Sequence, residues 1–212
     1  MRLAIRLVSV LCLSGLTVTA VCAQVSEQAN CTITADRSPA VRGIRLHMTA
    51  EQLLALFPDG GEKTSSHMSL IASAPNPPNF GVARLSFQPS VYGASVRERF
   101  AGVDSISITV FDGRVSEINL RYAGPDSNPR GPSWSNVDDF IAKLSEAFSL
   151  PQQKDWFERN QWSKSLKCNG FELDASTINR VGSISIRDNS YQETVRQRWA
   201  AAETKLRREF KP

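Results

Sequence analysis

Two runs of alternating apolar and polar residues, separated by one Asp-Gly pair, constrain the fold of this chain more than any other feature. The first run has isoleucine or valine at positions 106, 108 and 110, and the second has Ile118, Leu120 and Tyr122. Such alternation is typical of strands that bury one face, and an Asp-Gly pair between two such runs indicates a tight turn. The sequence therefore predicts a β-hairpin over residues 104–122.

The loop length of this hairpin decides which face each apolar residue occupies. A two-residue loop would place Ile106 opposite Asn119 and put the two apolar sets on opposite faces. A three-residue loop over 111–113, with Gly113 left-handed, would place Ile106 opposite Ile118 and put both sets on one face. We therefore expect the three-residue loop.

The residues before the hairpin predict a helix and two short strands. Thr49 followed three residues later by Gln52 forms a capping box, and the helix that begins there ends at Pro58. Alternation predicts a strand at 44–46 and another at 82–87. Residues 59–81 show no sustained apolar period, and we expect a loop there.

A similar order follows the hairpin. Ser135 is expected to cap a helix that ends at Pro151, and two strands are expected around 170–177 and 182–188. The last helix is expected to begin at Ser190, with Glu193 completing a capping box. Its apolar side chains share one face: Tyr191, Val195, Trp199, Ala202, Leu206 and Phe210.

This order of elements predicts an α+β protein with an antiparallel sheet and a C-terminal helix. Helix followed by sheet occurs twice, in residues 24–123 and 134–212, and suggests two similar halves in tandem. The linker between them, 124–133, is rich in Pro, Gly and Ser.

Residues 1–23 are typical of a signal peptide. Arg2 and Arg6 precede an apolar run of about 15 residues, and cleavage is expected after Ala23. That run is shorter than the roughly 20 residues of a membrane-spanning helix. Lipidation at Cys22 is the alternative, but a bulky valine precedes this cysteine. We expect a periplasmic or secreted protein with no membrane span in the mature chain.

Only Cys31 and Cys168 remain after such cleavage. In an oxidising compartment an even pair predicts a disulfide, which would join the two halves as one unit. Two separate buried thiols are the alternative. The bond would close a loop of about 137 residues, for which the chain-entropy account gives about 5 kcal/mol.

The charge of the chain does not indicate a nucleic-acid partner. Removing Arg2 and Arg6 lowers the formal net charge from +4 to +2, whereas nucleic-acid binding requires basic residues clustered on one face.

The residue types present do not predict catalysis, a metal site or a cofactor. The chain has two histidines, His47 and His67, and has no zinc-binding, phosphate-loop or dinucleotide motif. His67 lies within the expected loop, where we expect it to be solvated. We therefore expect a protein that is not an enzyme.

An aromatic cluster in the second half has two interpretations. It comprises Trp134, Trp156, Phe157, Trp162 and Phe171. The cluster either completes the core of a small sheet or forms an exposed contact surface, since Trp and Arg are frequent in binding hot spots. Our candidates for a contact surface are Trp156, Arg159, Trp162 and the loop around His67.

The segment Leu46–Leu53 resembles the Leu-Gly-Met-Thr entry of the SmpA/OmlA outer-membrane assembly lipoproteins and, more widely, β-lactamase-inhibitor-protein-like folds. His47 occupies the position of the family's glycine. The resemblance implies a fold of helices followed by a small antiparallel sheet, sometimes in tandem, and a function in binding other proteins.

Together these features predict an exported, non-catalytic module that binds an envelope or secreted protein. Two alternatives stay open. One is a secreted hydrolase that uses His67 with a loop serine or carboxylate. The other is an inhibitor of an exported enzyme that inserts residues 59–81.

Overall fold

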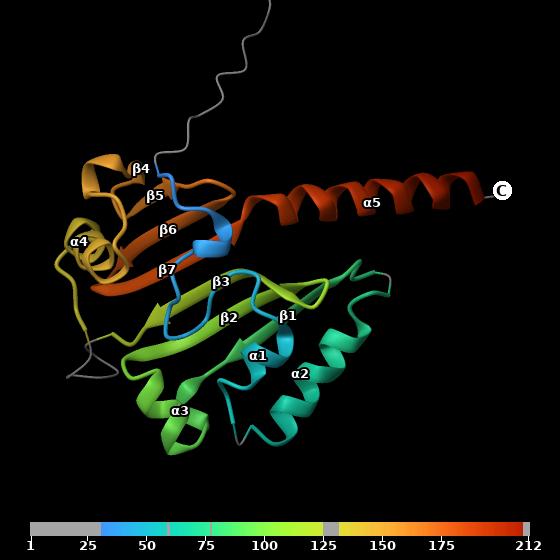
Figure 1. The fold of residues 1–212 in the computed structure, drawn as a ribbon, viewed down its shortest axis with the longest axis horizontal. Coiled ribbons are helices and arrows are strands. Elements are labelled where there is room, and N and C mark those ends of the chain that lie inside the picture. Colours follow the sequence, from blue (N-terminus) through green and yellow to red (C-terminus); the bar gives the residue numbers. More distant parts are fainter. Residues whose placement is uncertain (1–30, 59, 77, 125–131, 210–212) are drawn as a thin grey trace, which may run out of the picture.

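The computed structural model describes residues 31–58, 60–76, 78–124 and 132–209 (Figure 1). The predicted signal peptide, Cys22, most of the linker and Phe210 lie outside the described residues.

One antiparallel sheet of seven strands, in the order β1-β2-β3-β7-β6-β5-β4, organises the chain. The strands are β1 (Val82–Phe87), β2 (Val103–Phe111), β3 (Arg114–Tyr122), β4 (Phe157–Asn160), β5 (Ser163–Lys167), β6 (Phe171–Ile178) and β7 (Val181–Asp188). The helices are α1 (Ala50–Leu54), α2 (Glu62–Ser73), α3 (Ala94–Arg99), α4 (Val137–Phe148) and α5 (Asn189–Glu209). Short 3-10 turns lie at Ala35–Arg37, Pro89–Val91 and Gln153–Asp155. The α+β class and the C-terminal helix predicted from the sequence are confirmed.

The two predicted halves contribute to this single sheet. Strands β1, β2 and β3 form one meander, strands β4 to β7 form another, and the last strands of the two meanders pair with each other. At this junction Asn119 lies opposite Ser185 and Leu120 lies opposite Ile184. The sheet is therefore continuous across the boundary between the halves.

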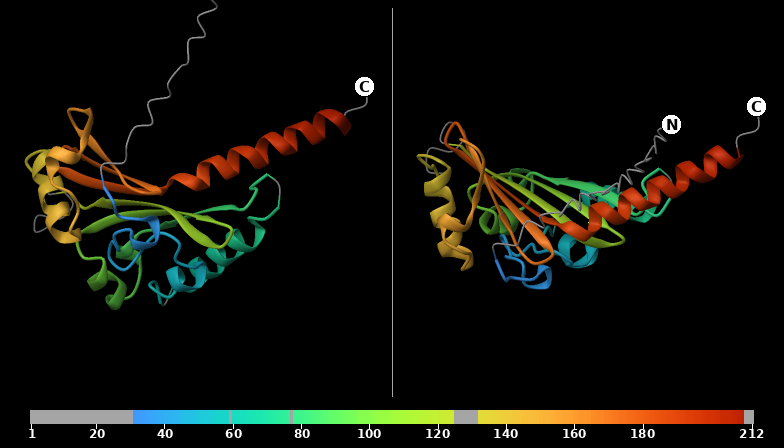
Figure 2. Two further views of the ribbon diagram at one scale, coloured as in Figure 1. Left: turned by 45° about the horizontal axis from the view of Figure 1, so that its top comes forward. Right: turned by 90° about the horizontal axis from the view of Figure 1, so that it is seen from above.

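In the described part of the chain, helices α1 to α4 lie on one face of the sheet (Figure 1). Figure 1 shows α1, α2 and α3 against the first half and α4 against the second. The strand side chains beneath them are apolar and buried, among them Leu85, Ile108, Ile118, Ile186 and Leu173. Helix α5 leaves the end of β7 and runs beyond the sheet (Figures 1 and 2). Away from α5, the opposite face of the sheet carries no helix among the described residues.

The predicted hairpin exists, but its expected loop is wrong. Phe111 pairs with Arg114, so the turn has two residues, and both Asp112 (φ 47°) and Gly113 (φ 76°) are left-handed. The register then shifts by one residue after Val110, which leaves Ser116 as a bulge. The bulge restores a common face for both apolar sets, because Ile106 now lies opposite Leu120 and Ile108 opposite Ile118.

The expected loop over 59–81 is also wrong, because residues 62–73 form helix α2. The inward positions of this segment are Thr64, His67, Ile71 and Ala74, whose spacing is that of one helical face. Only His67 is fully buried within the helix, so the apolar pattern is weak. The expected strand at 44–46 is replaced by an irregular segment with an isolated bridge between Val41 and Ile44.

The predicted helix caps have mixed outcomes. The Thr49–Gln52 capping box is present. Helix α4 is capped by Asn136 rather than Ser135, since the Asn136 side chain accepts a hydrogen bond from the Asp139 amide. The Ser190–Glu193 box is wrong: Asp188 accepts hydrogen bonds from the amide and hydroxyl of Ser190 and so occupies the capping position.

A disulfide joins Cys31 to Cys168, whose Cα atoms are 4.6 Å apart. Backbone hydrogen bonds support the same junction, since the Cys31 amide donates to the Lys167 carbonyl and the Asn169 amide donates to the Ile33 carbonyl. The N-terminal segment is thereby held to the turn between β5 and β6. Among the described residues, no helix is long and apolar enough to span a membrane.

Candidate binding face

The uncovered face of the sheet is formed by the strand side chains that alternate with the core. Strand pairing arranges these side chains in three cross-strand rows. The first row is Arg84, Thr109, Glu117, Arg187, Glu172 and Lys167. The second is Ser86, Ser107, Asn119, Ser185, Asp174 and Ser165. The third is Ser105, Arg121, Ser183, Ser176 and Ser163.

Several charged side chains of the first row and its neighbours have partners on adjacent strands. Arg187 donates to Asp174 at 2.9 Å, and Thr109 donates to Glu117 at 3.2 Å. Arg159, which extends from β4, donates to Ser165 at 2.8 Å and also pairs with Glu172. Charges of opposite sign on adjacent strands stabilise a sheet by a few tenths of a kcal/mol per pair, up to about 1 kcal/mol.

The second and third rows consist mostly of short hydroxyl side chains, and they form the floor of an open hollow of about 350 Å³. Serine rises little above the strands, so this part of the face lies lower than the charged row. The Ser176 and Ser183 hydroxyls bond to each other at 2.7 Å. No intramolecular side-chain hydrogen bond is present for Ser105, Ser107, Asn119 or Ser185 in the described part of the chain.

The aromatic candidates divide between core and surface. Trp156 is only 5% exposed and its indole N–H donates to the Pro151 carbonyl at 3.3 Å, so it does not belong to an exposed patch. Trp134 is likewise buried, in ring contact with Tyr122 and Phe140. Trp162 is 54% exposed, at the turn between β4 and β5. Of the predicted contact residues, Trp162 and Arg159 reach the surface of the second half.

His67 is buried, which corrects the expectation of a solvated histidine. Its ring lies 4.5 Å from that of Phe87, and burial lowers its pKa although a hydrogen bond with the Ser86 backbone acts in the opposite direction. A small hollow beside it is lined by Lys63, Ser66, Ser86, Gln88 and Tyr92. This lining includes no carboxylate that could orient His67 as a catalytic base.

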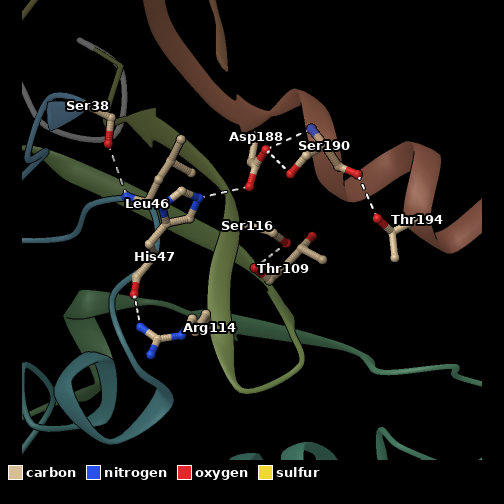
Figure 3. A network of polar contacts seen from close by, with 9 residues as sticks. All are labelled: Ser38, Leu46, His47, Thr109, Arg114, Ser116, Asp188, Ser190 and Thr194. Carbon is tan, nitrogen blue, oxygen red and sulfur yellow. Dashed lines mark hydrogen bonds and ion pairs between the residues drawn. The ribbon is translucent and has the colours of Figure 1, made fainter. Parts of the chain in front are cut away.

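His47 joins three parts of the fold (Figure 3). Its Nε2 lies 2.9 Å from Asp188 Oδ2, its amide donates to the Val115 carbonyl, and its carbonyl accepts from Arg114. Its backbone φ of 63° is left-handed, a conformation that glycine adopts without steric cost.

A second hollow, of about 490 Å³, lies on the helical side and is more apolar. It is lined by Val41, Arg42, Tyr122, Pro132, Ser133, Trp134, Phe140, Lys143, Leu144, Ala147 and Phe148.

Sequence reasoning missed the polar hollow, although its signal was present. The residues between the buried positions of the strands, such as Ser105, Ser107 and Asn119, are the polar members of the alternating pattern. Alternation shows that they point away from the core, but only the pairing of β3 with β7 places Asn119 opposite Ser185 and extends the rows of Ser105 and Ser107 onto β7.

The fold and this site define an α+β protein with a helix-covered sheet whose other face is polar and open. No family model matches the chain, and no curated protein or solved structure matches it either. The described residues contain no group of three or more histidine, cysteine, aspartate or glutamate side chains placed to hold a metal ion.

Proposed function

We propose that this chain is an exported, non-catalytic module whose open sheet face binds another protein of the envelope or the secreted fraction. The observation that carries the proposal is the face itself. Helices cover one side of the sheet, while the other side presents polar groups such as Ser107, Asn119 and Ser185 without intramolecular side-chain partners among the described residues.

The size of the face supports a protein partner. The seven described strands hold four to nine residues each, and at about 3.3 Å per residue and about 4.8 Å between strands they give a face of roughly 800 Å². A standard protein–protein interface buries about 800 Å² on each partner. The open face is therefore large enough for one protein domain, and its hollow accommodates a protruding segment of that domain.

Two further observations support export and binding. The Cys31–Cys168 disulfide is of the kind that persists in oxidising compartments. The resemblance of Leu46–Leu53 to envelope proteins that bind other proteins points to the same function.

The two alternatives have less support. A hydrolase based on His67 would need a carboxylate to orient that ring as a base, and the described lining of the hollow beside it includes none. An inhibitor that inserts residues 59–81 would need an extended loop, whereas residues 62–73 are helical.

Two matched substitutions test the proposal. Ser107→Trp fills the open face, and Ser69→Trp places the same side chain on the exposed surface of α2. The wild type and each purified variant are immobilised and exposed to the native periplasmic or secreted fraction. Any captured protein is then purified and titrated against the wild type and both variants by calorimetry. We expect 1:1 binding that Ser107→Trp abolishes and Ser69→Trp preserves. A protein that binds both variants equally would show that the open face is not the site.

Trp162→Ala examines the exposed turn between β4 and β5. Because Trp162 is exposed, its removal is expected to weaken binding of the captured protein without lowering the melting temperature. Unchanged affinity would place the contact away from the β4–β5 turn.

A further inference from the structure

Arg121 differs from the other cations of the open face. Arg159 and Arg187 pair with Glu172 and Asp174, as described above. Arg84 lies close enough to the Tyr191 side chain to oppose the rise that burial causes in the pKa of that phenol. Lys167 lies 5.2 Å from the Phe157 ring centroid. Within the described residues, Arg121 is the one cation of this face that contacts no anion, ring or hydrogen-bond acceptor through its side chain.

The position of Arg121 suits the recognition of an anion. It lies in the polar hollow, directly between Ser105 of β2 and Ser183 of β7 in the cross-strand row. Its planar guanidinium can donate two parallel hydrogen bonds to one carboxylate. The flanking hydroxyls add donors on either side.

We propose that Arg121 binds a carboxylate of the protein partner, so that the segment entering the hollow is acidic. An aspartate or glutamate side chain of that segment accepts hydrogen bonds from the Arg121 guanidinium and from the hydroxyls of Ser105 and Ser183. This inference rests on the proposed function and names the chemistry of its partner.

The lining of the hollow favours an acidic protein segment over other ligands. Its described lining contains no aromatic side chain, so it offers no stacking surface for a nucleobase. A single cation without a partner in the described part of the face is too little for a nucleic acid or an anionic membrane, which bind clustered basic residues. The neighbouring Asp174 is engaged by Arg187 and Ser165, so it does not neutralise Arg121.

A peptide titration tests this inference without the natural partner. The probe is an acetylated hexapeptide of alternating serine and glutamate, and the control peptide has glutamine in place of glutamate. Both are titrated to about 10 mM into the ¹⁵N-labelled mature protein, with its disulfide formed. Arg121→Gln removes the charge, and Arg121→Lys keeps the charge without the planar guanidinium. Arg97→Gln removes an exposed arginine of α3 that has no ion pair within the described residues.

We expect the acidic peptide to shift the amide signals of Asn119, Arg121 and Ser183 and the Nε–Hε signal of Arg121. The glutamine peptide and Arg121→Gln should each weaken binding at least tenfold, since a charge-assisted bidentate pair is lost. Arg121→Lys should have a smaller effect, and Arg97→Gln none. Absence of binding at 10 mM, shifts confined to Arg207 and Arg208, or unchanged binding by Arg121→Gln would each overturn the inference.

The two proposals can fail separately. In one outcome, Ser107→Trp abolishes partner binding, whereas Arg121→Gln binds both partner and peptide as the wild type does. The open face is then the site, but the inference that Arg121 binds an acidic segment is wrong. If the captured protein binds Ser107→Trp normally, the proposed site itself is wrong whatever the peptide does.

Discussion

His47 Nε2 lies 2.9 Å from Asp188 Oδ2, although 141 positions separate the two residues. The contact ties the segment that precedes α1 to the residue that caps α5 (Figure 3). Asp188 Oδ1 also accepts hydrogen bonds from the Ser190 amide at 2.8 Å and from its hydroxyl at 2.7 Å. One carboxylate therefore couples the N-terminal segment, the last strand and the last helix.

Asp188→Asn is expected to destabilise the protein in a pH-dependent way. Burial acts to raise the pKa of Asp188, but the hydrogen bonds from His47 and Ser190 outweigh burial and hold this pKa below its ordinary value of 3.8. A lowered folded-state pKa contributes stability that is present above the unfolded value and is lost as the pH falls through the folded value. We expect a loss of about 2 kcal/mol at pH 7.

Urea unfolding between pH 2.5 and 7 measures this effect. The difference between wild type and Asp188→Asn should shrink as the pH falls below about 4, because the wild-type carboxylate then takes up its proton. A difference that stays constant across this range would show that the charge of Asp188 contributes no stability.

Comparison of His47→Gly with His47→Ala isolates the backbone cost of the left-handed residue. Both variants lose the contact with Asp188, but alanine keeps a Cβ at a φ of 63°. That conformation costs a non-glycine residue about 1 kcal/mol. Denaturant midpoints should therefore rank wild type first, then His47→Gly, then His47→Ala. Equal stability of the two variants would contradict a strained backbone at this position.

Trp156 and Trp162 are expected to respond differently to truncation. Trp156 is buried, so Trp156→Ala should lower the free energy of unfolding by about 3 kcal/mol. Trp162→Ala should change it by less than about 0.5 kcal/mol, because the side chain is exposed. Chemical denaturation of both variants checks the contrast. A small effect of Trp156→Ala would restore that residue as a surface candidate.

Gly182→Ala tests the close packing of Trp134 on β7. A Cβ at position 182 would lie 2.7 Å from Trp134 Cζ3 and 2.9 Å from Cε3, which is too close for carbon atoms. We expect a loss of about 2 kcal/mol from overpacking. Ser185→Ala, on the open face of the same strand, is the control and should be nearly neutral. Equal melting temperatures for the two variants would exclude a tight Trp134 contact.

Removing the disulfide should cost several kcal/mol. Cys31 and Cys168 close a loop of 137 residues, for which loop entropy gives about 5 kcal/mol. Guanidinium unfolding of the double variant Cys31→Ser, Cys168→Ser measures the loss. Thiol titration of the unfolded wild type should find no free thiol. Two reactive thiols in protein purified from the periplasm would contradict the bond.

Local patterns predicted the elements whose signals lie within one segment. The hairpin follows from alternation around Asp112-Gly113, the start of α1 from Thr49 and Gln52, and helix α4 from its apolar spacing. The cysteine pair also follows from the sequence, because the other two cysteines fall within the predicted signal peptide. Each of these features depends on backbone periodicity, turn chemistry or a residue count that neighbouring residues do not alter.

Weak local signals produced the errors. Helix α2 has one fully buried residue, His67, and its polar composition resembles that of a loop. Its helical state is stabilised by contact with Phe87 of β1, which no pattern within residues 62–73 reveals. The bulge at Ser116 and the capping role of Asp188 likewise depend on which strand and which side chain lie opposite.

The sequence by itself determined that Ser107, Asn119 and Ser185 lie on the polar side of their strands. Only the tertiary structure decided that they share one hollow with Arg121, because the pairing of β3 with β7 joins strands from separate halves. The alternation of side chains along a strand follows from its own backbone, whereas the packing of the whole core determines which strand pairs with it.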